Sequence, residues 1–184
     1  MKKGSIAIII VAVCIIIGGF AYAFLSERSG KLRALDELDR AIDLAEEGLD
    51  ELEDASEDLN ELIGKSIIGK MGEREERFEI KDSIEAANSY CERALKIAKK
   101  QVDSNYEDVS MNAKDLVNAI EKEIGATSHF DNAYDYFMKN KFRSARSELN
   151  RGNDKLRDAK IAIDDIEYSV ERIEERIEEP FDVD

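Results

Sequence analysis

Residues 142–177, FRSARSELNRGNDKLRDAKIAIDDIEYSVERIEERI, carry the sequence pattern that decides the fold. Apolar or small residues recur there at steps that alternate between three and four. They are Phe142, Ala145, Leu149, Gly152, Leu156, Ala159, Ile163, Ile166, Val170, Ile173 and Ile177. This spacing places them on one face of an α-helix, as in a coiled coil or a long bundle helix. At a rise of 1.5 Å per residue, such a helix extends about 54 Å.

A second segment, residues 35–63, shows the same periodicity. Its apolar or small positions are Leu35, Leu38, Ile42, Ala45, Leu49, Leu52, Ser56, Leu59 and Ile63. The pattern predicts a helix over about residues 30–64. Because it has nearly the reach of the last helix, we expect the two to lie side by side and frame a bundle.

A turn and a third periodic segment follow. Gly64, Gly69 and Gly72 cluster, which predicts a turn between residues 64 and 72. A helix over residues 73–102 is expected next, with many small residues on its apolar face. That face consists of Ile80, Ile84, Ala87, Cys91, Ala94 and Ala98.

The middle of the chain contains capping signals. Ser104 and Glu107 have the spacing of a capping box, so a further helix is expected over residues 105–124. Gly125 would cap its carboxyl end. Its apolar face would consist of Tyr106, Val109, Ala113, Leu116 and Ile120.

Thr127 or Ser128 would then cap a short helix over residues 128–139, and the last helix would cover residues 142–179. Composition agrees with an all-α domain, since 38% of the residues are charged and there is one proline. We therefore expect an elongated antiparallel helical bundle or coiled coil of about four to five helices. This acidic domain would cover residues 26–180, followed by a tail at 181–184.

Residues 6–25, IAIIIVAVCIIIGGFAYAFL, contain no charged residue. A helix of about 20 apolar residues spans the hydrocarbon core of a bilayer. The run therefore predicts one transmembrane anchor, behind a short tail at residues 1–5. It implies a lipid bilayer as one partner of the chain.

Two processing alternatives to a permanent anchor are open. The basic start, the apolar run and Ala21-Tyr22-Ala23 resemble a secretory signal peptide with its cleavage site. Lys2-Lys3-Gly4-Ser5 resembles an archaeal prepilin cleavage site, although Ile10 stands where a mature pilin usually carries glutamate. We favour an uncleaved anchor, because the apolar stretch continues through Phe24 and Leu25.

Lysine and arginine flank the run on both sides, with Lys2 and Lys3 before it and Arg28, Lys31 and Arg33 after it. The positive-inside rule counts these residues and largely ignores acids, so the two sides are nearly balanced. A short basic start normally stays in the cytoplasm. We therefore expect a single-pass protein of the cell membrane whose soluble domain is extracytoplasmic.

The formal net charge is -15, and all 42 acidic residues follow residue 26. Such a surface repels nucleic-acid phosphates and anionic lipid headgroups, so neither is expected as a primary ligand. A protein partner or self-association fits better. The contact would involve the helical seam, the basic stretch at residues 139–160 or an aromatic cluster. That cluster contains Phe130, Tyr134, Tyr136, Phe137 and Phe142, and its spacing indicates a packed corner rather than an exposed patch.

No pattern of a catalytic or cofactor site is present. His129 is the single histidine, and Asp131 and Asp135 are the nearest potential metal ligands, but an exposed histidine near a helix start is the commoner case. Carboxylates along the acidic run at residues 50–61 splay outward on a helix and do not converge on a cation. Cys14 and Cys91 cannot pair with each other, and Cys91 sits at a core position. We expect no enzyme activity, no metal, no cofactor and no small-molecule substrate, since a narrow bundle offers no cleft.

Part of the chain resembles a tetratricopeptide repeat. Ala133, Tyr136, Asn140, Phe142, Ala145 and Leu149 match the small and aromatic spacing of its helical hairpin. The resemblance implies a peptide-binding hairpin. It covers about 20 residues, the tryptophan and proline of the repeat are missing, and Gly152 stands where a second alanine is usual.

These observations predict a membrane-anchored, non-enzymatic helical-bundle protein that acts as a structural or protein-interaction module. One alternative is an extracytoplasmic sensory or ligand-binding bundle, similar to the periplasmic four-helix domains of chemoreceptors. Those receptors carry a second membrane helix and a signalling domain, and this chain shows neither pattern. The tetratricopeptide-like hairpin is the other alternative.

Overall fold

The computed structural model describes residues 3–67 and 74–178, although the side chains of residues 3–21, 23, 24, 67, 74–76 and 178 lie outside the description. It contains α1 (Lys3–Ile67), α2 (Arg74–Gln101), α3 (Glu107–Met138) and α4 (Phe142–Glu178), and no strand occurs in this part of the chain. The prediction of an all-α bundle is confirmed.

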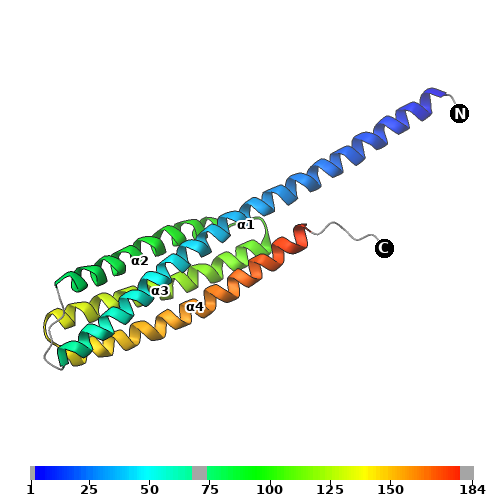
Figure 1. Cartoon of the computed structure of the whole chain (residues 1–184). Coiled ribbons are helices and arrows are strands. Elements are labelled where there is room, and N and C mark those ends of the chain that lie inside the picture. Colours follow the sequence, from blue (N-terminus) through cyan, green and yellow to red (C-terminus); the bar gives the residue numbers. More distant parts are fainter. Residues whose placement is uncertain (1–2, 68–73, 179–184) are drawn as a thin grey trace.

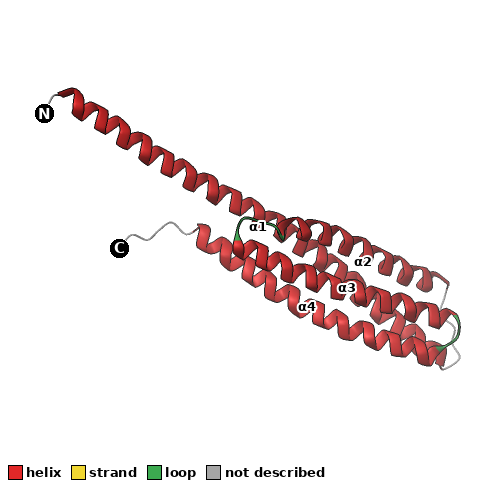
Figure 2. Ribbon diagram, turned by 180° about the vertical axis from the view of Figure 1, so that it is seen from behind, coloured by secondary structure: helices red, strands yellow, loops and turns green. Residues whose placement is uncertain are grey.

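The helices run up, down, up and down and pack side by side into an elongated four-helix bundle (Figure 1). The amino-terminal part of α1 leaves the bundle and projects from it as a single helix (Figures 1 and 2). The loop between α2 and α3 and the carboxyl end of α4 lie at the end from which α1 projects. The α3–α4 turn lies at the opposite end.

The periodic positions of the sequence form the core. On α4, nine of the predicted apolar or small positions are buried: Ala145, Leu149, Gly152, Leu156, Ala159, Ile163, Ile166, Val170 and Ile173. Phe142 and Ile177, at the two ends, are partly buried against the same core. Removing a leucine or isoleucine side chain from water is worth about 1.5–3 kcal/mol, so these faces supply most of the bundle's stability.

The predicted face of α1 needs one correction. Ala55 is buried where the heptad pattern placed Ser56, which is only half-buried. The Ser56 hydroxyl instead donates a hydrogen bond to Oδ1 of Asn153 on α4, 2.6 Å away. At the rim of the α1–α4 contact the hydroxyl can form a hydrogen bond, whereas the apolar core would offer it no hydrogen-bond partner.

The predicted helix break at Gly125 is wrong, because α3 continues from Glu107 to Met138. The Thr127 and Ser128 hydroxyls do not cap a new helix. They donate to the backbone oxygens of Glu123 and Ile124, one turn back, each over 3.1 Å. Gly125 lies inside the helix, where an added Cβ would come 3.2 Å from Lys155 on α4. This glycine therefore lies against the exposed side chain of Lys155 and does not end the helix.

The predicted capping box is also not formed. The amino-terminal cap of α3 is Tyr106, which makes no side-chain capping bond. Oγ of Ser104 accepts from the backbone N–H of Tyr106 at 3.3 Å and so shapes the loop before the helix. The helix restart near residue 105 is nevertheless found, since α2 ends at Gln101 and α3 begins at Glu107.

The α3–α4 turn closes with a Schellman motif. Asn140 has a positive φ of 58°. Its N–H donates to the oxygen of Phe137, and the N–H of Lys141 donates to that of Tyr136, both over 2.9 Å. These bonds satisfy the last carbonyls of α3. The helices joined here belong to a four-helix bundle and have 32 and 37 residues, so the fold is not that of a tetratricopeptide hairpin.

Replacing Asn140 with alanine should lower the free energy of unfolding by about 1 kcal/mol, because alanine tolerates the left-handed conformation less well than asparagine. Asn140→Gly is the matched control and should not destabilise the protein, since glycine adopts this conformation freely. Urea denaturation monitored by circular dichroism would measure both variants. Equal losses in the two would show that the asparagine side chain, not the backbone conformation, matters.

Among the residues whose side chains are described, no helix has both the length and the apolar character that crossing a membrane requires. The structure therefore gives no support to the predicted transmembrane helix. Most side chains of residues 6–25 lie outside the described residues.

Candidate functional site

Glu123, in the middle of α3, is a fully buried carboxylate with 0% of its surface exposed. The other buried polar side chains of the described core are Ser110, Asn112 and Thr127. Each of these three donates a hydrogen bond to a backbone oxygen. Neither carboxylate oxygen of Glu123 has a hydrogen-bond partner. A buried polar group without a partner costs about 1–3 kcal/mol, and more when it is charged, so this residue opposes folding.

Three helices meet around this carboxyl group. On α1, a Cβ added at Gly48 would come within 2.3 Å of Oε1 of Glu123. It would also lie 3.4 Å from Cβ of Tyr90 and 3.5 Å from the backbone oxygen of Ala87, both on α2. Gly48 therefore leaves the space that the glutamate side chain occupies between α1 and α2.

Cys91 of α2 completes the pocket around Glu123. Its side chain is fully buried, and its thiol is free. Burial raises the pKa of Glu123 to about 8 and outweighs the interaction with the neighbouring Cys91 thiol, which lowers it. A thiol is a weak donor, so its contact leaves the carboxylate unsatisfied. The pKa of Cys91 is raised as well, first by burial and then by the nearby acid, so this thiol is not a nucleophile in the folded state.

At pH 7 the native state therefore holds Glu123 largely protonated, as a neutral acid. No charged side chain among the described residues contributes to this shift. The arrangement resembles no metal centre, because one thiol and one carboxyl are too few ligands. Chemically, it can bind and release a proton.

Glu123 was not predicted as a core residue, although its place in the apolar series of α3 indicates one. Once α3 is taken as continuous, its buried face runs through Val109, Ala113, Leu116, Ile120, Glu123, Thr127, Phe130, Ala133 and Phe137. The steps between these positions are three or four throughout. A glutamate in the middle of such a series is an anomaly, but the predicted helix end at Gly125 made it a terminal residue.

The predicted metal-ligand candidates do not converge. His129 Nδ1 lies 2.7 Å from Oε2 of Glu148 on α4. Asp131 pairs with Lys81 of α2, whereas Asp135 pairs with Lys139 one turn along its own chain. Within the described ranges, no group of three or more His, Cys, Asp or Glu residues could hold a metal ion.

The His129–Glu148 pair joins α3 to α4. The hydrogen bond from His129 lowers the pKa of Glu148, and Arg151, whose Nη1 lies 2.7 Å from Oε1, adds to this effect. Because both partners of the pair lie at the edge of the bundle, with side chains 24% and 14% exposed, the pair acts as a helix-to-helix contact.

The aromatic cluster forms a packed corner, as its spacing indicated. Phe130 is fully buried, and the rings of Phe137 and Phe142 pack against each other across the α3–α4 turn in a tilted arrangement, with centroids 5.9 Å apart. Tyr134 and Tyr136 are partly buried against the same core. An added Cβ at Gly152 of α4 would come 2.7 Å from the Phe130 ring, so the glycine admits this ring into the helix contact.

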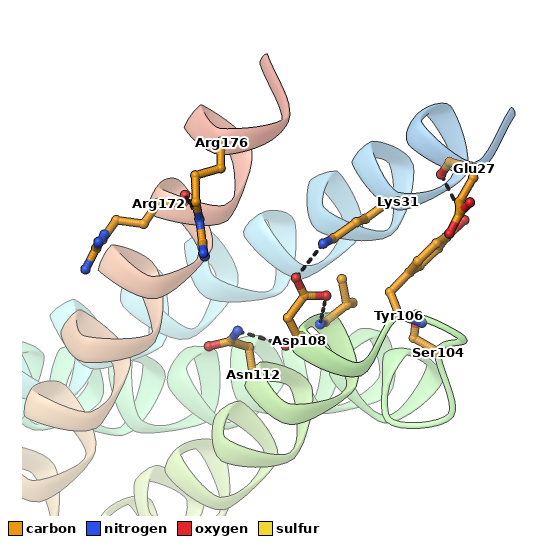
Figure 3. Close-up of polar contacts among 9 residues, drawn as sticks. Glu27, Lys31, Ser104, Tyr106, Asp108, Asn112, Arg172 and Arg176 are labelled. Atoms are coloured by element: carbon orange, nitrogen blue, oxygen red, sulfur yellow. Dashed lines mark hydrogen bonds and ion pairs between the residues drawn. The ribbon is translucent and has the colours of Figure 1, made fainter. Parts of the chain in front are cut away.

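A second polar cluster lies where α1 leaves the bundle (Figure 3). The Tyr106 hydroxyl donates to the backbone oxygen of Glu27 over 3.1 Å, and Lys31 forms an ion pair with Asp108. Gly30 allows this approach, since an added Cβ would lie 2.4 Å from the Tyr106 hydroxyl. These contacts brace the start of α3 against α1.

The described part of the surface carries grooves that are open to solvent. One of about 410 Å³ lies between α1 and α4 and is lined by Ser56, Asn153 and Lys160, among others. Another of about 380 Å³ lies between α2 and α3, beside Lys81, Asn88 and Thr127. Both are open to solvent and are lined by polar as well as apolar atoms.

The surface shared by α1 and α4 is strongly acidic. Residues 41–64 contain ten acids and no lysine or arginine. Burial, followed by repulsion from neighbouring acids on both helices, raises the pKa of Asp39 and of Glu46. Lys160 of α4 offsets part of this charge by pairing with Glu53.

No protein-family model, curated protein or solved structure matches this chain.

Proposed function

We propose that this protein is a membrane-tethered, non-enzymatic helical rod that acts as a structural or protein-interaction module. The observation that carries the proposal is the continuity of α1. This helix of 65 residues runs without interruption from Lys3 into the bundle. The uncharged run at residues 6–25 lies in the part of α1 that projects beyond the bundle. A rod whose first helix also serves as its anchor needs no flexible linker.

The brace at the base of the bundle supports this role. Tyr106 and Asp108, at the start of α3, hold the backbone of Glu27 and the side chain of Lys31 on α1. The contacts lie just after the apolar run, where the helix would emerge from a bilayer. They couple the direction of α1 to that of the bundle, so the rod's orientation follows that of the anchor.

The surface favours a protein partner over other ligands. The grooves between α1 and α4 and between α2 and α3 are open to solvent, whereas small substrates are usually held in deep pockets. The net charge of -15 disfavours nucleic acid. The partner would therefore be another protein, or a second copy of this chain, on the extracytoplasmic side of a cell membrane.

The buried acid in the core specifically favours one second candidate, an extracytoplasmic sensory bundle. A buried carboxyl group without a hydrogen-bond partner costs stability, and an apolar side chain could fill the same space without this cost. A function that depends on the charge state of Glu123 would explain why the core contains this acid. In this alternative the bundle would pass a signal to a partner protein.

Alkaline carbonate extraction of membranes that contain the full chain would test the tether. The wild-type protein should stay in the membrane fraction. Ile10→Arg with Ile16→Arg should release it, because each arginine at the centre of a membrane helix costs about 2.5–3.5 kcal/mol. Ile10→Leu with Ile16→Leu is the matched control and should behave like the wild type. Extraction of the wild type, or a mature mass that begins after Ala23, would contradict a permanent anchor.

A further inference from the structure

We propose that Glu123 is a proton-binding site that locks α1, α2 and α3 together, and that loss of its proton opens the bundle at this layer. The inference concerns the bundle core alone and holds whether or not the chain is anchored in a membrane.

In the closed bundle an ionised Glu123 has neither a hydrogen-bond partner nor contact with solvent. Its carboxyl group faces Gly48 on α1 and Cys91 on α2, and both of its oxygens lack a hydrogen-bond partner. The Thr127 hydroxyl, on the same helix, donates to the backbone oxygen of Glu123 and is not free to serve the carboxylate. A buried carboxylate without a counter-ion is far more costly than a buried neutral acid.

The titratable and charged groups around this site are few. From α2 the Cys91 thiol faces the acid, and its own ionisation is suppressed by burial and by Glu123. From α1 the facing residue is glycine. No charged group of α4 contributes to the pKa of Glu123 in the described residues. Water can therefore stabilise the ionised form only if the helices separate.

Separation at this layer would change two properties at once. It would loosen the contact of α1 with α2, and α1 is the helix that projects from the bundle. It would also expose Cys91, which is fully buried in the closed bundle. The exposure of this thiol gives a direct readout of opening.

The test is the rate at which Cys91 reacts with N-ethylmaleimide in the full chain, held in detergent micelles. A Cys14→Ser background leaves Cys91 as the single thiol. The rate is measured from about pH 5 to 9 with Glu123 and with Glu123→Gln. The intrinsic pH dependence of thiol reactivity is the same in both proteins and cancels in the ratio of the two rates.

We expect this ratio to rise about tenfold per pH unit between about pH 5 and 8 and to level off above pH 8. The direction follows from linkage, because the closed form holds its proton up to a higher pH than the open form does. Glu57→Gln, at an exposed position of α1, is the matched control and should leave the profile of the parent unchanged. A ratio that does not change with pH would overturn the proposal.

Circular dichroism would show whether the glutamine variant folds, and Glu123→Met would replace it if it does not. Infrared difference spectroscopy on the unsubstituted full chain gives an independent readout. It should show a protonated carboxyl band at pH 7 that disappears as the pH is raised, and that is absent from the Glu123 variant. Absence of this band from the unsubstituted protein would also contradict the proposal.

Discussion

Replacing Glu123 with methionine should raise the free energy of unfolding, and the gain should increase with pH. Methionine fills the same space with an apolar side chain, so the cost of a buried unpartnered acid disappears. The additional gain between pH 5 and pH 8 should be about 3 kcal/mol. It arises because the pKa of Glu123 lies at about 8 in the folded protein and near 4.5 when the side chain is exposed.

The sign of this effect follows from the direction of the pKa shift. The native state binds the proton more tightly than the unfolded state, so Glu123 is least destabilising below about pH 4.5. Its cost grows as the pH rises to about 8 and is then constant. Urea denaturation of both proteins at several pH values would measure the difference. A stability gain that does not vary with pH would mean that Glu123 titrates normally in the folded state.

Replacing Gly152 with leucine should destabilise the bundle by about 3 kcal/mol, the upper end of the range for an overpacked core. Even the Cβ atom alone would come 2.7 Å from Cε1 and 2.9 Å from Cδ1 of Phe130. That ring is fully buried and cannot swing into solvent. The α3–α4 contact must widen to admit the new side chain.

A second helical glycine provides the control for this prediction. Nothing lies within 4 Å of a Cβ added at Gly64 of α1, so Gly64→Ala should stabilise the protein by about 0.5–1 kcal/mol through helix propensity. Thermal and urea denaturation of both variants would give the comparison. Tolerance of leucine at position 152 would show that the Phe130 ring is not held as tightly as its burial indicates.

The long heptad patterns were the reliable part of the sequence. Periodic burial every three or four residues requires a helix packed along its length, and the ends of α2 and α4 fall close to the predicted ones. The interruptions between helices were less predictable than the helices themselves. A glycine in this position is typical of a helix end. Gly125 instead lies inside α3, against the side chain of Lys155, a residue 30 positions further along the chain. Local sequence does not contain that information.

The candidate site could not be predicted for a related reason. Recognising Glu123 as a core residue requires α3 to be continuous, and recognising its neighbours requires the register between helices. Gly48 lies 75 positions before Glu123, and sequence alone does not show that the two meet. The role of Cys91 as a small buried residue, in contrast, followed directly from its place in the heptad pattern and is confirmed.

The central claim is that α1 joins the apolar run to the bundle as one rigid helix. Electron paramagnetic resonance would test it by measuring the distance between nitroxide labels at Tyr22, inside the apolar run, and at Asp54, inside the bundle, in the full chain reconstituted in liposomes. Both residues are exposed on α1, and their separation along the helix corresponds to about 48 Å. A rigid α1 should give a single narrow distribution near that distance. A broad distribution with shorter distances would contradict it, because it would show that the helix bends or breaks where it leaves the bundle.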